Sequence, residues 1–192
     1  MGASSRAHVR GHSVCLGLSG PVQKPGVNTL QGQANESLVI VNSVFSWAAA
    51  RMGASIGWTS IQLNVNTVAD WHVDVGNIGL SMMIVLGDFS GGEFEIGDSG
   101  PLQLNGKAVL FGGQEHHRSL PARGQRWSLV AFTSYVSNSC HDSLQRQMRV
   151  LGFPGGSPEV PRPARVRLFL DLCAGASAPL SFAVAASGKG CA

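Results

Sequence analysis

The chain has 192 residues, of which 44% are hydrophobic and only 13% are charged, and its formal net charge is +3. This balance excludes a disordered chain, which combines low hydrophobicity with high net charge, and the length suits one domain with attachments. The 25 glycines and 9 prolines follow no collagen-like period.

The N-terminal part is rich in Gly, Ser and Gln and has no sustained hydrophobic period. We therefore expect a poorly ordered lead-in over residues 1–36, with one short strand near residues 14–18. Apolar residues at helical spacing follow over residues 37–51, and this segment ends at Arg51, shortly before Gly53. These features predict a short amphipathic helix.

The middle of the chain has the pattern of short β-strands. Residues 58–66 alternate and place Ile61, Leu63 and Val65 on one face, whereas residues 80–86 form a continuous apolar run of strand length. A turn is predicted over 87–92, followed by strands at 93–96, 107–111 and 127–134. Short strands at regular spacing favour a β-sandwich or jelly roll over βαβ units.

The character of the sequence changes after residue 137. Residues 139–151 predict a helix with Ser139 or Asp142 near its cap, and the sequence FPGGSPEVPRPAR that follows Leu151 and Gly152 predicts a linker. Residues 166–172 suit a buried strand, followed by a small-residue turn and an apolar helix. We therefore expect a lead-in (1–36), a core (37–137), a helix and linker (138–165) and a βα segment (166–192). That last segment either packs on the core or begins another domain.

The cysteines and the hydropathy indicate the compartment. The four cysteines are scattered and form no CxxC pair, which favours a reducing compartment over a disulfide framework or a cysteine zinc site; they are Cys15, Cys140, Cys173 and Cys191. No apolar run reaches the roughly 18 residues of a membrane helix, and no apolar signal segment follows the N-terminus. We expect an intracellular protein, cytoplasmic or nuclear, that does not engage a membrane.

The charges are unevenly distributed along the chain. Acidic residues dominate between Asp70 and Glu115, and arginines dominate between Arg118 and Arg167. Such a split could steer an anionic partner to the second segment, although an ordinary basic surface accounts for it more simply. No pattern of a known nucleic-acid-binding module is present.

Three residues have the spacing of metal ligands. His72 and Asp74 directly follow an alternating strand, and residues two apart in a strand face the same side. Either His116 or His117, after the 107–111 strand and a Gly-Gly turn, supplies a second imidazole. Two histidines and one carboxylate form the facial triad that holds non-haem Fe(II) with open positions. The alternative for His72 and Asp74 is a surface ion pair.

A second group of polar residues suits an organic anion. Arg126 and Ser128 enter the last strand on one face, where a guanidinium and a hydroxyl can bind a distal carboxylate. A metal triad followed by such a clamp suits a 2-oxoacid that chelates iron, although a surface arginine and a strand hydroxyl are the alternatives. Asn64, Asn66 and Asn77 flank the metal pair and could bind cosubstrate or substrate, or form turns.

Three stretches of the chain resemble a known family. WHVDVGN, GGEFEI and GKAVLFGGQEHHRSLPARGQRWSLVAF resemble the core of the Fe(II)/2-oxoglutarate-dependent dioxygenases, with prolyl-4-hydroxylase-like and TET/JBP-like members, including short protist ones, the most similar. The resemblance implies a mainly β fold. Its core would be a double-stranded β-helix (jelly roll) with one or two flanking helices and a short C-terminal βα unit.

The resemblance also implies the site residues and the reaction. It assigns His72, Asp74 and His117 as iron ligands, because the family's Pro turn and arginine are spaced from His117 and not from His116. Arg126 would bind the carboxylate of 2-oxoglutarate, supported by Ser128. The implied enzyme consumes O2 and 2-oxoglutarate, releases succinate and CO2, and hydroxylates a macromolecular substrate, a peptide side chain or a nucleic-acid base. Ascorbate is a candidate accessory reductant.

Two alternative functions remain from the sequence. The stretch DLCAGASAP (171–179) resembles the glycine-rich first motif of S-adenosylmethionine-dependent methyltransferases, so the chain could be a fragment of a methyltransferase-linked polyprotein. It could also be a non-catalytic, cupin-like binding module. Succinate formation that depends on Fe(II) separates the dioxygenase from both alternatives.

Overall fold

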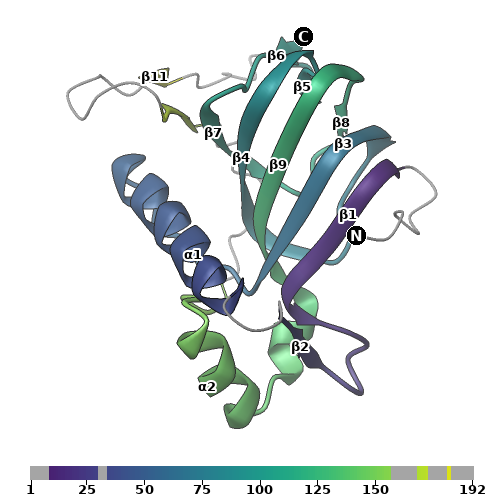
Figure 1. Ribbon diagram of the computed structural model, residues 1–192. Coiled ribbons are helices and arrows are strands. Elements are labelled where there is room, and N and C mark those ends of the chain that lie inside the picture. The colour runs from purple at the N-terminus through teal and green to yellow at the C-terminus, as the bar shows by residue number, and fades with distance from the viewer. Residues whose placement is uncertain (1–8, 30–33, 157–167, 173–180, 183–192) are drawn as a thin grey trace, which may run out of the picture.

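A curled antiparallel sheet dominates the computed structural model, which describes residues 9–29, 34–156, 168–172 and 181–182 (Figure 1). The helices are α1 (Ala34–Arg51), α2 (Asp142–Val150) and the 3-10 helix η1 (Tyr135–Ser139). The strands are β1 (Val9–Ser19), β2 (Gly26–Asn28), β3 (Ser60–His72), β4 (Asn77–Gly91), β5 (Phe94–Ile96), β6 (Pro101–Leu102), β7 (Lys107–Gly112), β8 (His117–Ser119), β9 (Ala122–Ser134), β10 (Leu168–Asp171) and β11 (Ser181–Phe182).

Strand β3 joins the two halves of the sheet. The strand order is β11-β10-β7-β4-β9-β3-β8-β5-β6, with β1 paired to β3 and β2 paired to β1. The first part of β3 pairs with β9, from Ser60 to Val65, and its end pairs with β8. Between these parts Asn66 has a φ of 50°, and the register shifts after Ala69. The predicted mainly β, jelly-roll fold is confirmed.

The two faces of the central strands belong to different cores. Met82 and Ile84 of β4 pack in a cluster with residues of α1, whereas Met83 and Val85 pack in a second cluster with residues of β5 and β7. Successive strand residues point to opposite faces, so a strand covered on both sides is mostly apolar. This explains why residues 80–86 form a continuous apolar run.

Helix α1 covers the outer face of the sheet (Figure 1). The helix predicted over 37–51 is confirmed, and it begins earlier, at Ala34. Its buried side carries a polar residue, Asn42, whose Nδ2 donates to the Leu151 carbonyl at 2.7 Å and whose Oδ1 accepts from Trp58 Nε1 at 2.7 Å. Asn42 thus ties α1 to the chain that enters β3 and to the end of α2. None of the described helices has the length and apolar character needed to span a bilayer.

The poorly ordered lead-in predicted for 1–36 is wrong for the described part of that segment. The strand predicted at 14–18 is present, but it is part of the longer β1, which pairs with β3 from Val9 opposite Ala69 to Gly17 opposite Ser60. Main-chain hydrogen bonds to a neighbouring strand need no hydrophobic period, and Leu16 and Leu18 complete the burial. Residues 1–8 and 30–33 lie outside the described residues.

Two local predictions in the middle of the chain also need correction. The turn predicted at 87–92 is wrong, because β4 continues to Gly91 and pairs there with Ala122 of β9. Glycine at 87 adopts a φ of 135° and lets β4 bend against β9 without ending. The helix predicted over 139–151 is α2, preceded by η1, and His141 occupies the N-cap in place of Ser139 or Asp142.

The described parts of the C-terminal segment extend the same core and sheet. Phe153, expected in the linker, is buried in the α1 cluster, and Gly155 forms a bridge with Trp58. Strand β10 pairs with β7 and buries Leu170, so it extends the sheet. Of the two predicted alternatives, packing on the core or beginning another domain, these residues follow the first. At 181–182 the chain forms β11, antiparallel to β10, where an apolar helix was predicted. The rest of the predicted linker and helix, in 157–167, 173–180 and 183–192, lies outside the described residues.

Candidate functional site

The first two predicted ligands lie where β3 leaves the sheet. His72 is the last residue of β3, and Asp74 follows in the loop that leads to β4. The Asp74 main-chain N–H donates to the Gly113 carbonyl at 2.9 Å, which attaches this loop to the segment after β7. His72 Nε2 lies 3.8 Å from Asp74 Oδ1. The end of β3 and the loop after it therefore present an imidazole and a carboxylate to the same space.

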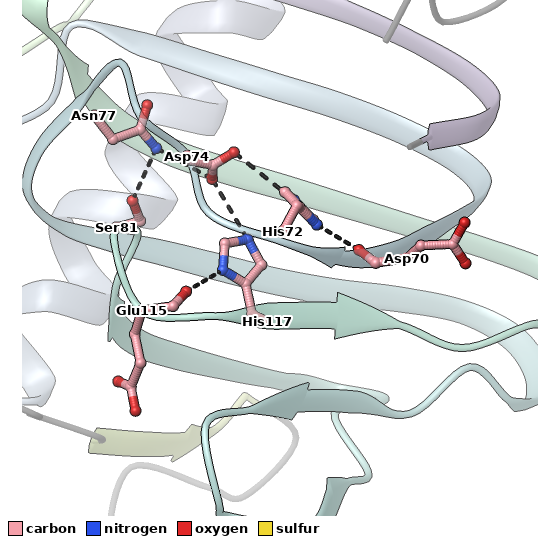
Figure 2. A network of polar contacts seen from close by, with 7 residues as sticks. All are labelled: Asp70, His72, Asp74, Asn77, Ser81, Glu115 and His117. Carbon is pink, nitrogen blue, oxygen red and sulfur yellow. Dashed lines mark hydrogen bonds and ion pairs between the residues drawn. The ribbon is translucent and has the colours of Figure 1, made fainter. Parts of the chain in front are cut away.

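The third predicted ligand comes from a strand that pairs with β3. His117 begins β8 directly opposite His72, and its Nε2 lies 3.5 Å from Asp74 Oδ2 (Figure 2). The ring is only 4% exposed and packs edge-on against Phe111, with Phe94 beside it. Its neighbour His116 precedes β8 and lies outside this cluster. The structure thus brings His117, and not His116, beside the His72–Asp74 pair.

The two imidazoles have the same tautomer. His72 Nδ1 lies 2.7 Å from the Asp70 carbonyl, and His117 Nδ1 lies 2.7 Å from the Glu115 carbonyl. A carbonyl oxygen only accepts hydrogen bonds, so each Nδ1 carries a hydrogen and Nε2 is the nitrogen of each ring that can bind a metal. Such bonds fix the ring orientation of metal-binding histidines. Both Nε2 atoms face the Asp74 carboxylate (Figure 2).

The donor set suits a divalent transition metal. One ligand atom from each of His72, Asp74 and His117 can be chosen so that all three lie within 4.8 Å of one another. Two imidazoles and one carboxylate on one side of an ion form a facial triad, which leaves three positions open and is typical of non-haem Fe(II). The residues present therefore fit iron by type, number and arrangement.

A cavity of about 120 Å³ opens beside these three residues. Its volume exceeds that of a single water site several-fold, so a small organic molecule is a suitable occupant. Apolar side chains line one part of it, including Phe94, Phe111 and Phe132. The polar lining comprises Gln62, Asn64, Thr67, Asn77, Ser119 and Ser128, besides the three candidate ligands.

Ser128 and Arg126 lie two residues apart on β9 and share a face of that strand. Ser128 lines the cavity and accepts a hydrogen bond from Asn64 Nδ2 at 3.3 Å. Arg126 does not line the cavity itself, but is 1% exposed at the next inward position of β9. The structure therefore places the predicted anion clamp along the strand that forms one wall of the cavity.

Residues of β3, of β4 and of the segment after β4 surround Arg126. Asn66, at the positive φ of β3, accepts the Arg126 main-chain N–H through Oδ1 at 2.8 Å, which replaces a strand-to-strand bond. Gly92 lies against the side chain, since a Cβ there would come within 2.9 Å of Arg126 Cδ. The guanidinium carbon also lies 5.9 Å from the Phe89 ring centre. The absence of a side chain at Gly92 thus leaves room for the Arg126 side chain inside the protein.

Arg126 is a buried cation in need of an anion. Its Nε and Nη2 atoms are buried and have no hydrogen-bond partner among the described residues. Burial lowers the pKa of Arg126 to about 10, so the group stays charged near neutral pH. Burying a charge without a partner is costly, and two N–H groups of one guanidinium match a carboxylate in bidentate geometry. The side chain therefore fits an organic carboxylate.

Sequence reasoning missed several polar residues of the cavity. Gln62, Thr67 and Ser119 line it, and Ser81 lies nearby, within reach of Asn77. For Gln62 a signal was present, because it alternates with Ile61 and Leu63 and so belongs to the opposite face of β3. The others needed knowledge of the strand pairing.

Comparison with solved structures identifies the fold. The chain is similar to the crystal structure of an oxidoreductase of the 2OG-Fe(II) oxygenase family from Burkholderia pseudomallei, with a TM-score of 0.50 and 18% sequence identity. The similarity covers 70% of this chain and 72% of that one. No protein-family model and no curated protein matches the sequence. The two proteins share a fold.

Proposed function

We propose that this chain is an Fe(II)- and 2-oxoglutarate-dependent dioxygenase that hydroxylates a protein side chain or a nucleic-acid base. One observation carries the proposal. A facial set of two imidazoles and a carboxylate lies at one end of a cavity whose wall, β9, also holds a buried guanidinium without a partner among the described residues. Together these two features suit a metal-chelating molecule with a second, distal carboxylate, which neither feature would indicate by itself.

Each residue of the site has a distinct role in this proposal. His72, Asp74 and His117 would hold iron, which supplies the activation of O2 when bound. Arg126 would pair with the distal carboxylate of 2-oxoglutarate through Nε and Nη2, and the Ser128 hydroxyl would donate to the same group. The carbonyls of residues 70 and 115 keep both imidazoles in the ligating tautomer. The aromatic side chains make one part of the cavity apolar.

The experiment that tests the proposal is anaerobic loading followed by turnover. Purified protein is titrated with Fe(II) and then with 2-oxoglutarate, and the visible charge-transfer band of the chelate is recorded. On exposure to O2, succinate is quantified with and without Fe(II). We expect the band and Fe(II)-dependent succinate in the wild type, and neither in His72→Ala.

The outcome separates this proposal from its alternatives. Iron and 2-oxoglutarate binding without succinate would indicate the non-catalytic, cupin-like module. A wild-type protein that binds neither iron nor 2-oxoglutarate would contradict the dioxygenase proposal. A methyltransferase fragment would bind neither iron nor 2-oxoglutarate and would form no succinate.

The substrate class belongs to the same proposal. Within the described part of the arginine-rich segment, Arg118 is paired with Glu95 at 2.7 Å and Arg126 is buried, whereas Arg123, Arg146 and Arg149 are exposed. Screening peptide and oligonucleotide pools for stimulation of succinate formation distinguishes the two macromolecules. Ascorbate is tested in the same assay as a factor that sustains repeated turnover.

A further inference from the structure

We propose that Asn77 is a positioning residue that holds the Asp74 carboxylate in its ligating orientation; this inference rests on the metal site proposed above. Asn77 begins β4 and is 8% exposed. Its side-chain Nδ2 lies 3.3 Å from Asp74 Oδ2 and 3.4 Å from Ser81 Oγ (Figure 2). One amide therefore links a candidate metal ligand to a residue inside the sheet.

The main chain fixes the amide relative to the carboxylate. The Asn77 N–H donates to the Asp74 carbonyl at 3.0 Å, which closes the loop between the two residues. Gln114 Nε2 donates to the Asn77 carbonyl at 3.1 Å from the segment after β7. Asn77 is thus held on both sides, and its amide has little freedom to leave Asp74.

A glycine provides the space in which this amide lies. A Cβ at Gly113 would come within 3.0 Å of Ser81 Oγ and 3.1 Å of Asn77 Nδ2, which is tighter than ordinary contact. Gly113 also accepts the main-chain N–H of Asp74. The same short segment therefore anchors the ligand-bearing loop and leaves room for the amide that contacts its carboxylate.

The carboxylate needs such a contact more than the imidazoles do. Each imidazole has one ligating nitrogen, and its other nitrogen is bound to a carbonyl. Asp74 is the most exposed of the three side chains, at 23%, and offers two oxygens of equal chemistry. A hydrogen bond to Oδ2 favours binding of the metal through a single oxygen, which preserves the open positions that a chelating cosubstrate requires.

The inference is tested with Co(II) alone as the probe, because its visible spectrum reports the coordination geometry. We expect Asn77→Ala to lower the Co(II) affinity about 10- to 100-fold and to alter the spectrum, as is typical for loss of a residue that orients a ligand. The matched control is Asn64→Ala, a second cavity amide with the same 8% exposure that bonds Ser128 and no candidate ligand. Its Co(II) affinity and spectrum should equal those of the wild type.

A second variant keeps the test decisive if Asn77→Ala does not fold. Gly113 does not have a positive φ, so Gly113→Ala is compatible with the backbone and displaces the amide while retaining it. We expect it to change the Co(II) spectrum in the same direction. An unchanged spectrum in the folded variants, or an equal change in Asn64→Ala, overturns the positioning role alone. If the wild type binds no Co(II), the metal site fails and this inference fails with it.

Discussion

Replacing Arg126 with methionine separates two effects that the buried guanidinium combines. Burial lowers the pKa of Arg126 to about 10. A decrease of this size from the usual arginine pKa corresponds to about 3 kcal/mol, which is what the folded protein loses by keeping the group charged near pH 7. Because the folded-state pKa lies below the unfolded one, this loss is complete below pH 10 and shrinks as the pH rises further.

Methionine is a flexible side chain of similar length that carries no charge. We therefore expect Arg126→Met, without 2-oxoglutarate, to raise the free energy of unfolding by up to about 3 kcal/mol. Any packing energy lost in the substitution is subtracted from this value. For a chain of this size, 1 kcal/mol shifts Tm by roughly 2–4 °C, so the upper limit is a rise of about 6–12 °C. Removing one partner of a buried charge pair costs about 2–5 kcal/mol, so affinity for 2-oxoglutarate should fall roughly 30- to several-thousand-fold.

The assay is thermal unfolding of the Mn(II)-loaded protein with and without 2-oxoglutarate, combined with calorimetric titration of the cosubstrate. The control is Arg123→Met, at an exposed position of the same strand, for which neither quantity should change. If Arg126→Met were less stable than the wild type and still gained the same Tm increase from 2-oxoglutarate, the reasoning would be refuted. Arg126 would then be a packing residue.

Three further changes test other parts of the structure. His117→Ala should abolish Co(II) binding in a spectroscopic titration, whereas His116→Ala should leave it intact; the reverse result would contradict the choice of ligand. Asn42→Ala leaves the Trp58 indole N–H and a main-chain carbonyl without partners, so urea unfolding should show a loss of about 2–4 kcal/mol; an unchanged midpoint would argue against that bond pair. Leu170→Ala should lower the stability of the whole core by about 2–5 kcal/mol in one transition, unless β10 unfolds separately.

The part of the site that could be predicted from the sequence depends on neighbouring residues. His72 and Asp74 are two residues apart, so strand alternation predicts that they share a side; β3 ends at His72, and Asp74 keeps that side from the loop that follows. Arg126 and Ser128 follow from the same rule on β9. Strand geometry alone does not choose between His116 and His117. Strand β8 is only three residues long, and its register is set by pairing with β3.

The features that were missed depend on contacts between distant segments. Strand β1 has no hydrophobic alternation, and its order comes from pairing with β3 some fifty residues later. Ser81 and Gly113 meet at Asn77 only because β4 and β7 are adjacent in the sheet. The glycines at 87 and 91 are typical of turns, yet here they let two long strands stay paired through a bend.

The two-part pairing of β3 limits where the chain can change in length. Between Asn66 and His72 the strand passes from its partner β9 to its partner β8. Its last residue is the candidate metal ligand His72. Insertion of one residue there would turn His72 to the opposite face, and insertion of two would keep its side but move it by about 7 Å. Insertions and deletions between homologous chains should therefore be absent from this stretch and should accumulate in loops such as 97–100.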